Sequence, residues 1–171
     1  VYGITNNLNW KNWDFSIIGS GSHGNELYMR HLFSTANLDG VFNMVRRAGD
    51  RFRSPSNPGE GIFGTTVGGG VVTGVERDWP NSNFVWDASF FTIRNITMGY
   101  TFTKLPKAIK SARIYASAQN VFVFTSYWGG SNPEVSMQNN GQGDGGNLSP
   151  GVDLAPYPVP RTITFGANIN F

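Results

Sequence analysis

The sequence from Arg161 to Phe171, RTITFGANINF, alternates apolar and polar side chains along its whole length. Odd-numbered positions from Ile163 onward are apolar, whereas even-numbered positions from Thr162 onward carry Thr, Gly or Asn. A period of two predicts a β-strand whose two faces meet different surroundings. A strand with one face in a soluble core alternates in the same way, so the neighbouring segments must decide what those surroundings are.

Three other segments show the same alternation. From Ser111 to Gln119, and again over Asn95–Phe102, the even-numbered positions are apolar and the odd-numbered positions are mostly polar. Tyr2–Trp10 follows this rule with one exception at Asn6. Four segments with one apolar and one polar side predict a sheet that separates two environments.

Two local features refine the predicted strands. Only two residues separate Trp10 from Trp13, which is the spacing of a two-residue hairpin turn. Ile93 falls out of phase with Ile96, which predicts a β-bulge near residues 94–95. The expected strands are 2–10, 13–24, 90–103, 111–124 and 161–171.

The connections between these strands alternate in length. Residues 11–12 and 104–110 form short connections, whereas residues 25–89 and 125–160 form long ones rich in Gly, Asn, Pro and Ser. Outer-membrane barrels have this asymmetry, with short periplasmic turns and long outer loops. We expect the long connections to hold no core of their own, apart from a short helix over Asn37–Arg47. We expect an aromatic girdle at the periplasmic end, formed by Trp10, Trp13, Tyr100, Phe102 and Phe171.

The composition supports strands and excludes several classes of function. Charged residues make up 14 % of the chain, against about 25 % in soluble domains, and aromatic residues another 14 %. The net charge of +2 is spread along the chain, so we expect no nucleic-acid partner. No apolar run reaches the length of a transmembrane helix, and there is no cysteine.

The fold class that these observations predict is all-β, a transmembrane antiparallel β-barrel. Bacterial single-chain barrels have an even number of strands, from about 8 upward, and an open sheet edge in lipid leaves backbone groups unpaired. The five expected strands therefore cannot close a barrel. We expect residues 1–171 to be the C-terminal part of a longer barrel whose earlier strands precede Val1.

Four motifs occur in order along the chain. They are NWKNWDFSIIGSGSHGNELY (9–28), DASFFTIRNITMGYTF (87–102), SARIYASAQNVFVFTSYWGGSNPEVS (111–136) and GVDLAPYPVPRTITFGANINF (151–171). In these motifs and their spacing the chain resembles the SusC/RagA-type TonB-dependent transporters of Bacteroidetes outer membranes. The intervening residues 29–86 contribute nothing to the resemblance beyond their place in the order.

The resemblance implies a plugged barrel of about 22 strands in the bacterial outer membrane. Such a protein imports oligosaccharides or oligopeptides with energy delivered by TonB, which would contact the missing N-terminal part. A SusD-like surface lipoprotein would close over the barrel as a lid. The resemblance implies neither an enzyme nor a cofactor.

Three groups of residues are candidates for function. We expect the polar sides of the strands to face the lumen, through Arg113, Ser117, Gln119, Thr162, Thr164, Asn168 and Asn170. We expect the last strand to carry the signal for barrel assembly, in Phe165, Ile169 and Phe171. Aromatic loop residues are candidates for contact with substrate or partner, with an interfacial belt as the alternative: Tyr127, Trp128, Trp79 and Trp86.

No catalytic or metal site is predicted. His23 and His31 have only Glu26 as an obvious carboxylate partner, and Gly68–Gly70 lacks the Lys-Ser/Thr of a phosphate loop. Asp144 and Asp153 lack the ordered spacing of a calcium loop. The rival interpretation is a soluble carbohydrate-binding β-sandwich, which would pack its apolar strand faces inward.

Overall fold

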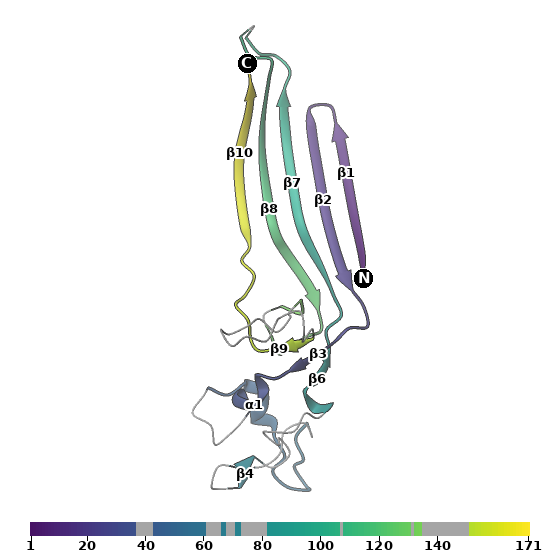
Figure 1. Cartoon of the computed structure of the whole chain (residues 1–171), viewed down its shortest axis with the longest axis vertical. Helices are drawn as coiled ribbons and strands as arrows, with labels where there is room; N and C mark the ends of the chain where they lie inside the picture. Colours follow the sequence, from purple (N-terminus) through teal and green to yellow (C-terminus); the bar gives the residue numbers. More distant parts are fainter. Residues whose placement is uncertain are drawn as a thin grey trace, which may run out of the picture. The chain divides into compact units, whose positions relative to one another are not determined.

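The computed structural model describes residues 1–36, 43–60, 66–67, 71–72, 82–106, 108–130, 132–134 and 151–171. The chain divides into two compact units (Figure 1). The strand unit comprises Val1–Asn25, Ala88–Tyr127 and Tyr157–Phe171. The loop unit comprises Glu26–Asp87 and Trp128–Pro156.

The strand unit is a single antiparallel sheet with strand order β1-β2-β7-β8-β10 (Figure 1). All five predicted strands are confirmed, and their observed ends differ from the predicted ends by at most two residues. The strands are β1 (Tyr2–Trp10), β2 (Trp13–Ser22), β7 (Phe90–Phe102), β8 (Ser111–Thr125) and β10 (Thr162–Asn170).

The backbone register places the apolar side chains of all five strands on one face of the sheet. Directly paired residues share a face, and Met98 of β7 pairs with Phe15 of β2 and with Ala116 of β8. Phe165 of β10 in turn pairs with Ala116. This apolar face is uncovered: Phe165 is 80 % exposed and Leu8 58 % exposed. An uncovered apolar face of this extent is rare in a soluble monomer.

A bulge keeps the apolar face continuous along β7 and β8. Relative to β2, strand β7 has one extra residue, Arg94, between Ile93 and Asn95. On the other neighbour, β8, two residues, Asn120 and Val121, lie opposite Arg94. Asn120 has a φ of 52°, a left-handed conformation that Asn tolerates better than most residues. The predicted bulge is confirmed. It also accounts for the apolar run after Asn120, because its residues alternate between the two faces.

The opposite face, the polar face, is organised around an ion pair that crosses a strand. Arg113 of β8 donates to Asp14 of β2 through Nε (2.9 Å to Oδ1) and Nη2 (2.5 Å to Oδ2). Both side chains pass over Gly99 of the intervening strand β7, where a Cβ would stand 2.6 Å from Arg113 Nε and from Asp14 Oδ1. Tyr115 similarly covers Gly166 of β10. Glycine at these positions therefore lets side chains from neighbouring strands meet.

Hydrogen bonds connect other side chains of the polar face. Asn95 Nδ2 donates to Ser117 Oγ over 3.1 Å, and Thr97 Oγ1 donates to Asn95 Oδ1 over 2.7 Å. Arg94 Nε donates to Ser20 Oγ over 2.8 Å. These bonds give partners to polar groups that lie only partly exposed.

Aromatic side chains gather at one end of the sheet. Trp10 pairs with Trp13 across the predicted two-residue turn, in which Lys11 has a φ of 54°. The ring of Trp13 lies 4.8 Å from that of Tyr100, which lies 5.1 Å from that of Phe102. Both short turns and the C-terminal end of β10 lie at this end (Figure 1). The predicted gathering of aromatic residues is confirmed.

The loop unit contradicts the expectation that the long connections hold no core. Strands β6 (Val85–Asp87), β3 (Glu26–Met29) and β9 (Val152–Asp153) form a sheet in that order, in which β3 and β9 are parallel. The buried hydrophobic residues of the unit are Leu27, Met29, Leu32, Ala36, Ala48 and Phe84. They lie in, or directly after, elements of at most five residues, which are too short to show a period, so pattern reading misses them.

Short elements complete the described part of the loop unit. They are α1 (Leu32–Thr35), two 3-10 helices, η1 (Arg46–Asp50) and η2 (Ser82–Phe84), and the strands β4 (Thr66–Val67) and β5 (Val71–Val72). Residues 37–42 of the expected helix over Asn37–Arg47 lie outside the described residues. Its remainder is not α-helical, because Val45 is extended (ψ 138°) and η1 begins after it. No helix in the described residues is long and apolar enough to span a membrane.

We predict that the change Gly99→Ala destabilises the sheet, because the new methyl group would displace the Arg113–Asp14 pair. Overpacking of this kind costs roughly 1–3 kcal/mol. The control is Gly3→Ala, where a Cβ would meet only Gly19 O at an ordinary 3.6 Å. The measurement is the temperature at which the intact purified protein loses its compact band in SDS gels. Equal temperatures for the two variants would contradict the role assigned to Gly99.

Candidate functional site

Two tryptophans and an arginine from three separate segments form a cluster in the loop unit. The ring centroids of Trp86 and Trp128 lie 5.2 Å apart, with the rings almost perpendicular. The Arg47 guanidinium lies 5.0 Å from the Trp86 ring and 4.7 Å from the Trp128 ring. Contacts of this geometry attract the cation to the electron-rich ring faces. We refer to Arg47, Trp86 and Trp128 as the Trp–Arg cluster.

Polar partners hold two of the three members of the Trp–Arg cluster, Arg47 and Trp86. Glu60 accepts a hydrogen bond from Arg47 Nε, so the charge of Arg47 is compensated within the unit. Trp86 Nε1 donates to the backbone oxygen of Asn83 over 2.9 Å. Trp128 Nε1 is buried and has no hydrogen-bond acceptor among the described residues. Arg47 therefore serves to hold the two rings.

A cleft opens beside Trp128. Its volume is about 530 Å³, and the described residues that line it are Val45, Arg46, Arg47, Trp128 and Gly129. Met29 lies directly behind Gly129, where a Cβ would overlap its sulfur atom. Arg46 is exposed at the cleft and has no polar partner among the described residues. The cleft thus combines apolar surface with one uncompensated cation.

Two of the histidine and carboxylate candidates, His31 and Asp153, have structural partners. His31 Nδ1 lies 3.8 Å from Oδ1 of Asp153, which is fully buried. The same oxygen accepts the backbone N–H of Ala155 over 2.7 Å. These contacts join the end of β3 to β9. Within the described residues, no group of three His, Asp or Glu side chains is placed to hold a metal.

The pKa of Tyr28 in the loop unit is shifted from its ordinary value. The Tyr28 ring stands edge-on to Phe84, with 6.1 Å between centroids. Burial raises the pKa of the Tyr28 phenol above its ordinary value, and the nearby charge of Arg30 offsets part of that rise.

The structure brings together only some of the aromatic candidates. Trp86 and Trp128 meet in the cluster, whereas Tyr127 is buried, with 6 % of its surface exposed. Trp79 lies outside the described residues, as do Gly68–Gly70 and Asp144. Sequence reasoning missed Arg46 and Arg47, although the run RRAGDRFR over residues 46–53 was a signal that it did not use.

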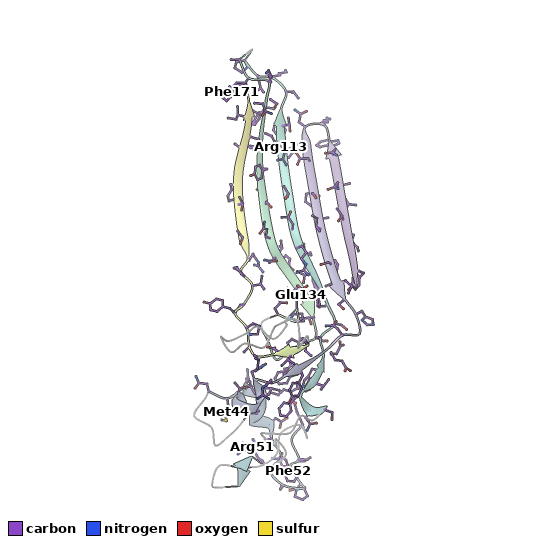
Figure 2. The ribbon with its side chains drawn as sticks, viewed as in Figure 1. Met44, Arg51, Phe52, Arg113, Glu134 and Phe171 are labelled. Atoms are coloured by element: carbon purple, nitrogen blue, oxygen red, sulfur yellow. The ribbon has the colours of Figure 1, made fainter. Side chains whose placement is uncertain are left out.

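The strand candidates occupy the faces that the alternation predicts. The polar-face group follows from the pairing of β8 with β10. It comprises Arg113, Ser117, Gln119, Thr162, Thr164, Asn168 and Asn170. Phe165 and Ile169 lie on the apolar face, and Phe171 follows the end of β10 and is 76 % exposed (Figure 2).

We predict that Arg47→Ala loosens the Trp–Arg cluster. A cation–π contact contributes from about 0.5 to 2 kcal/mol, so the loss of two contacts should speed local hydrogen exchange roughly tenfold. The measurement is exchange mass spectrometry of the intact protein, in peptides that contain Val85–Asp87 and Trp128. Arg53→Ala, which removes an exposed arginine outside the cluster, is the control. If both variants exchange at the same rate, Arg47 does not hold the rings.

Comparison with known proteins covers the whole chain. The chain is 32 % identical to TonB-dependent receptor P26 of Formosa agariphila and covers 17 % of that protein. It is 28 % identical to TonB-dependent receptor SusC of Bacteroides thetaiotaomicron and covers 15 % of it. The chain therefore spans about one sixth of the length of these relatives. No family model matches it.

Solved structures show the same fold. The chain aligns over 99 % of its length with 17 % of one chain of the RagAB peptide importer in its open-open state, with a TM-score of 0.70 and 17 % identity. For the closed-closed state the TM-score is 0.66 over 95 % of the chain. The chain belongs to the SusC/RagA-type TonB-dependent receptors and has the fold of part of their transmembrane antiparallel β-barrel.

Proposed function

We propose that the chain is the C-terminal part of the barrel wall of an outer-membrane importer of oligomeric nutrients. The observation that carries this proposal is the uncovered apolar face shared by five strands, with a hydrogen-bonded polar face behind it. Lipid covers such an apolar face in a barrel, and the polar face then borders the lumen. The similarity to TonB-dependent receptors supports the same arrangement.

The polar face would line the import pathway. Arg113 and Asp14 offer paired charges there, and Ser117, Gln119 and Thr164 offer hydroxyl and amide groups. These groups hydrogen-bond to passing polar oligomers without reacting with them. We therefore propose transport without covalent chemistry on the substrate.

The loop unit would lie at the outer mouth, where oligosaccharides or oligopeptides arrive. Support comes from the length of its connections and from the Trp–Arg cluster with its adjacent cleft. A SusD-like lipoprotein would close over this mouth. TonB would act through the part of the protein that precedes these residues.

The last strand would also guide assembly of the barrel. β10 is at the edge of the described sheet, so one side of its backbone is open to pairing with another strand. Phe165, Ile169 and Phe171 present exposed apolar groups along it. An assembly factor that adds a strand at this edge would read these side chains.

The rival β-sandwich needs a second sheet packed on the apolar face. Met98 on the central strand β7 and Ile114 on β8 are 47 % and 51 % exposed on that face, which no sandwich core would leave. The likeness to the RagAB importer supports the barrel interpretation as well.

We predict that Ala118→Arg removes the intact receptor from the outer membrane, whereas Gln119→Arg leaves it there. Both residues lie near the middle of β8, Ala118 on the apolar face and Gln119 on the polar face. Arginine on a lipid-facing position costs about 2–4 kcal/mol near the bilayer centre. The measurement is the amount of folded receptor in isolated outer membranes. Normal insertion of the Ala118 variant would overturn the assignment of the apolar face to lipid.

A further inference from the structure

The segment Asn43–Glu60 of the loop unit is unusually basic. It contains four arginines and two carboxylates, so its net charge of +2 (4 − 2) equals that of the whole chain. Two of the four arginines have partners inside the segment: Arg47 binds Glu60, and Arg53 donates to the backbone oxygen of Gly49. Arg46 has no polar partner among the described residues, and it lines the cleft. An exposed arginine without a partner at a cleft is free to bind an anionic group of a ligand.

The rest of the cleft favours an apolar group next to that anion. Besides Arg46 and Arg47, the described residues that line it are Val45, Trp128 and Gly129. None of the five described lining residues carries a side-chain hydrogen-bond acceptor. A sugar carries hydroxyl groups on most carbons and needs acceptors as well as donors. A peptide that places a carboxylate beside a small apolar side chain needs only what the cleft provides.

The cleft is also held in shape before any ligand arrives. Trp128 is fixed by Arg47 and Trp86, and Met29 fills the space behind Gly129. A site whose walls are already ordered loses little conformational entropy on binding. Its volume of about 530 Å³ accommodates one or two amino-acid residues.

We propose that this cleft is a subsite for acidic peptides, in which Arg46 binds a ligand carboxylate and Val45 and Trp128 contact the adjoining apolar side chain. This inference rests on the proposed function, because it names the oligomer that the outer mouth selects. Arg47 is a positioning residue for Trp128 and does not bind the ligand. Arg46 is the residue that determines specificity.

The test measures binding to the intact receptor purified in detergent. The probes are the N-acetylated, C-amidated peptide Gly-Val-Glu-Val-Gly and its twin with Gln in place of Glu. We expect the glutamate peptide to bind about tenfold more tightly than its twin, as for one charge-assisted hydrogen bond. Arg46→Gln should abolish this preference, and Arg46→Lys should keep part of it. Arg53→Gln is the matched control and should leave the preference unchanged.

Three results would overturn the inference. The first is equal binding of the two peptides, and the second is an equal loss of preference in the Arg46→Gln and Arg53→Gln variants. The third is Arg46-dependent binding of a galacturonic acid trimer without binding of the peptides.

Uptake by cells separates this inference from the proposed function. If cells import oligomers in a receptor- and TonB-dependent way with no preference for the glutamate peptide, only the subsite fails. If the receptor supports no oligomer uptake, the proposed function fails.

Discussion

The backbone register of the five-stranded sheet places apolar side chains on one face and polar side chains on the other, and the rest of the strand unit depends on this separation. A shift of one residue on any strand would move its apolar set to the polar face. The bulge formed by Arg94 against Asn120 and Val121 is the point at which the phase is corrected. It keeps the apolar face continuous on two long strands, from the aromatic end to Phe122 and Phe124.

Glycines let side chains from neighbouring segments meet in both units. Gly99 makes room for the Arg113–Asp14 pair, and Gly166 makes room for the Tyr115 ring. In the loop unit, Gly129 makes room for Met29. Each of these glycines leaves space for the side chain of a residue that is distant in the sequence. Substitution there would act on packing and on the adjoining polar network together.

The strand unit could be predicted well from the sequence, because a sheet with one apolar and one polar face requires apolar and polar residues to alternate along each strand. The five strands, the turn after Trp10 and the bulge all follow from that alternation, and the structure confirms them. The core of the loop unit could not be predicted in this way. Its buried residues come from short elements far apart in the chain, such as Leu27, Ala48 and Phe84. The Trp–Arg cluster was half predicted, because exposed tryptophans suggest binding, but their arginine partner depends on tertiary contacts.

Site-directed spin labelling along β8 of the intact receptor in lipid bilayers tests the central claim most directly. Single cysteines are introduced from Ala112 to Phe124, and the accessibility of each label to oxygen and to a polar nickel complex is measured. The account predicts high oxygen accessibility at even positions from Ala112 to Ala118, a break in the pattern at Asn120 and Val121, and high oxygen accessibility again at Phe122 and Phe124. Equal accessibility to the nickel complex on both faces would contradict it.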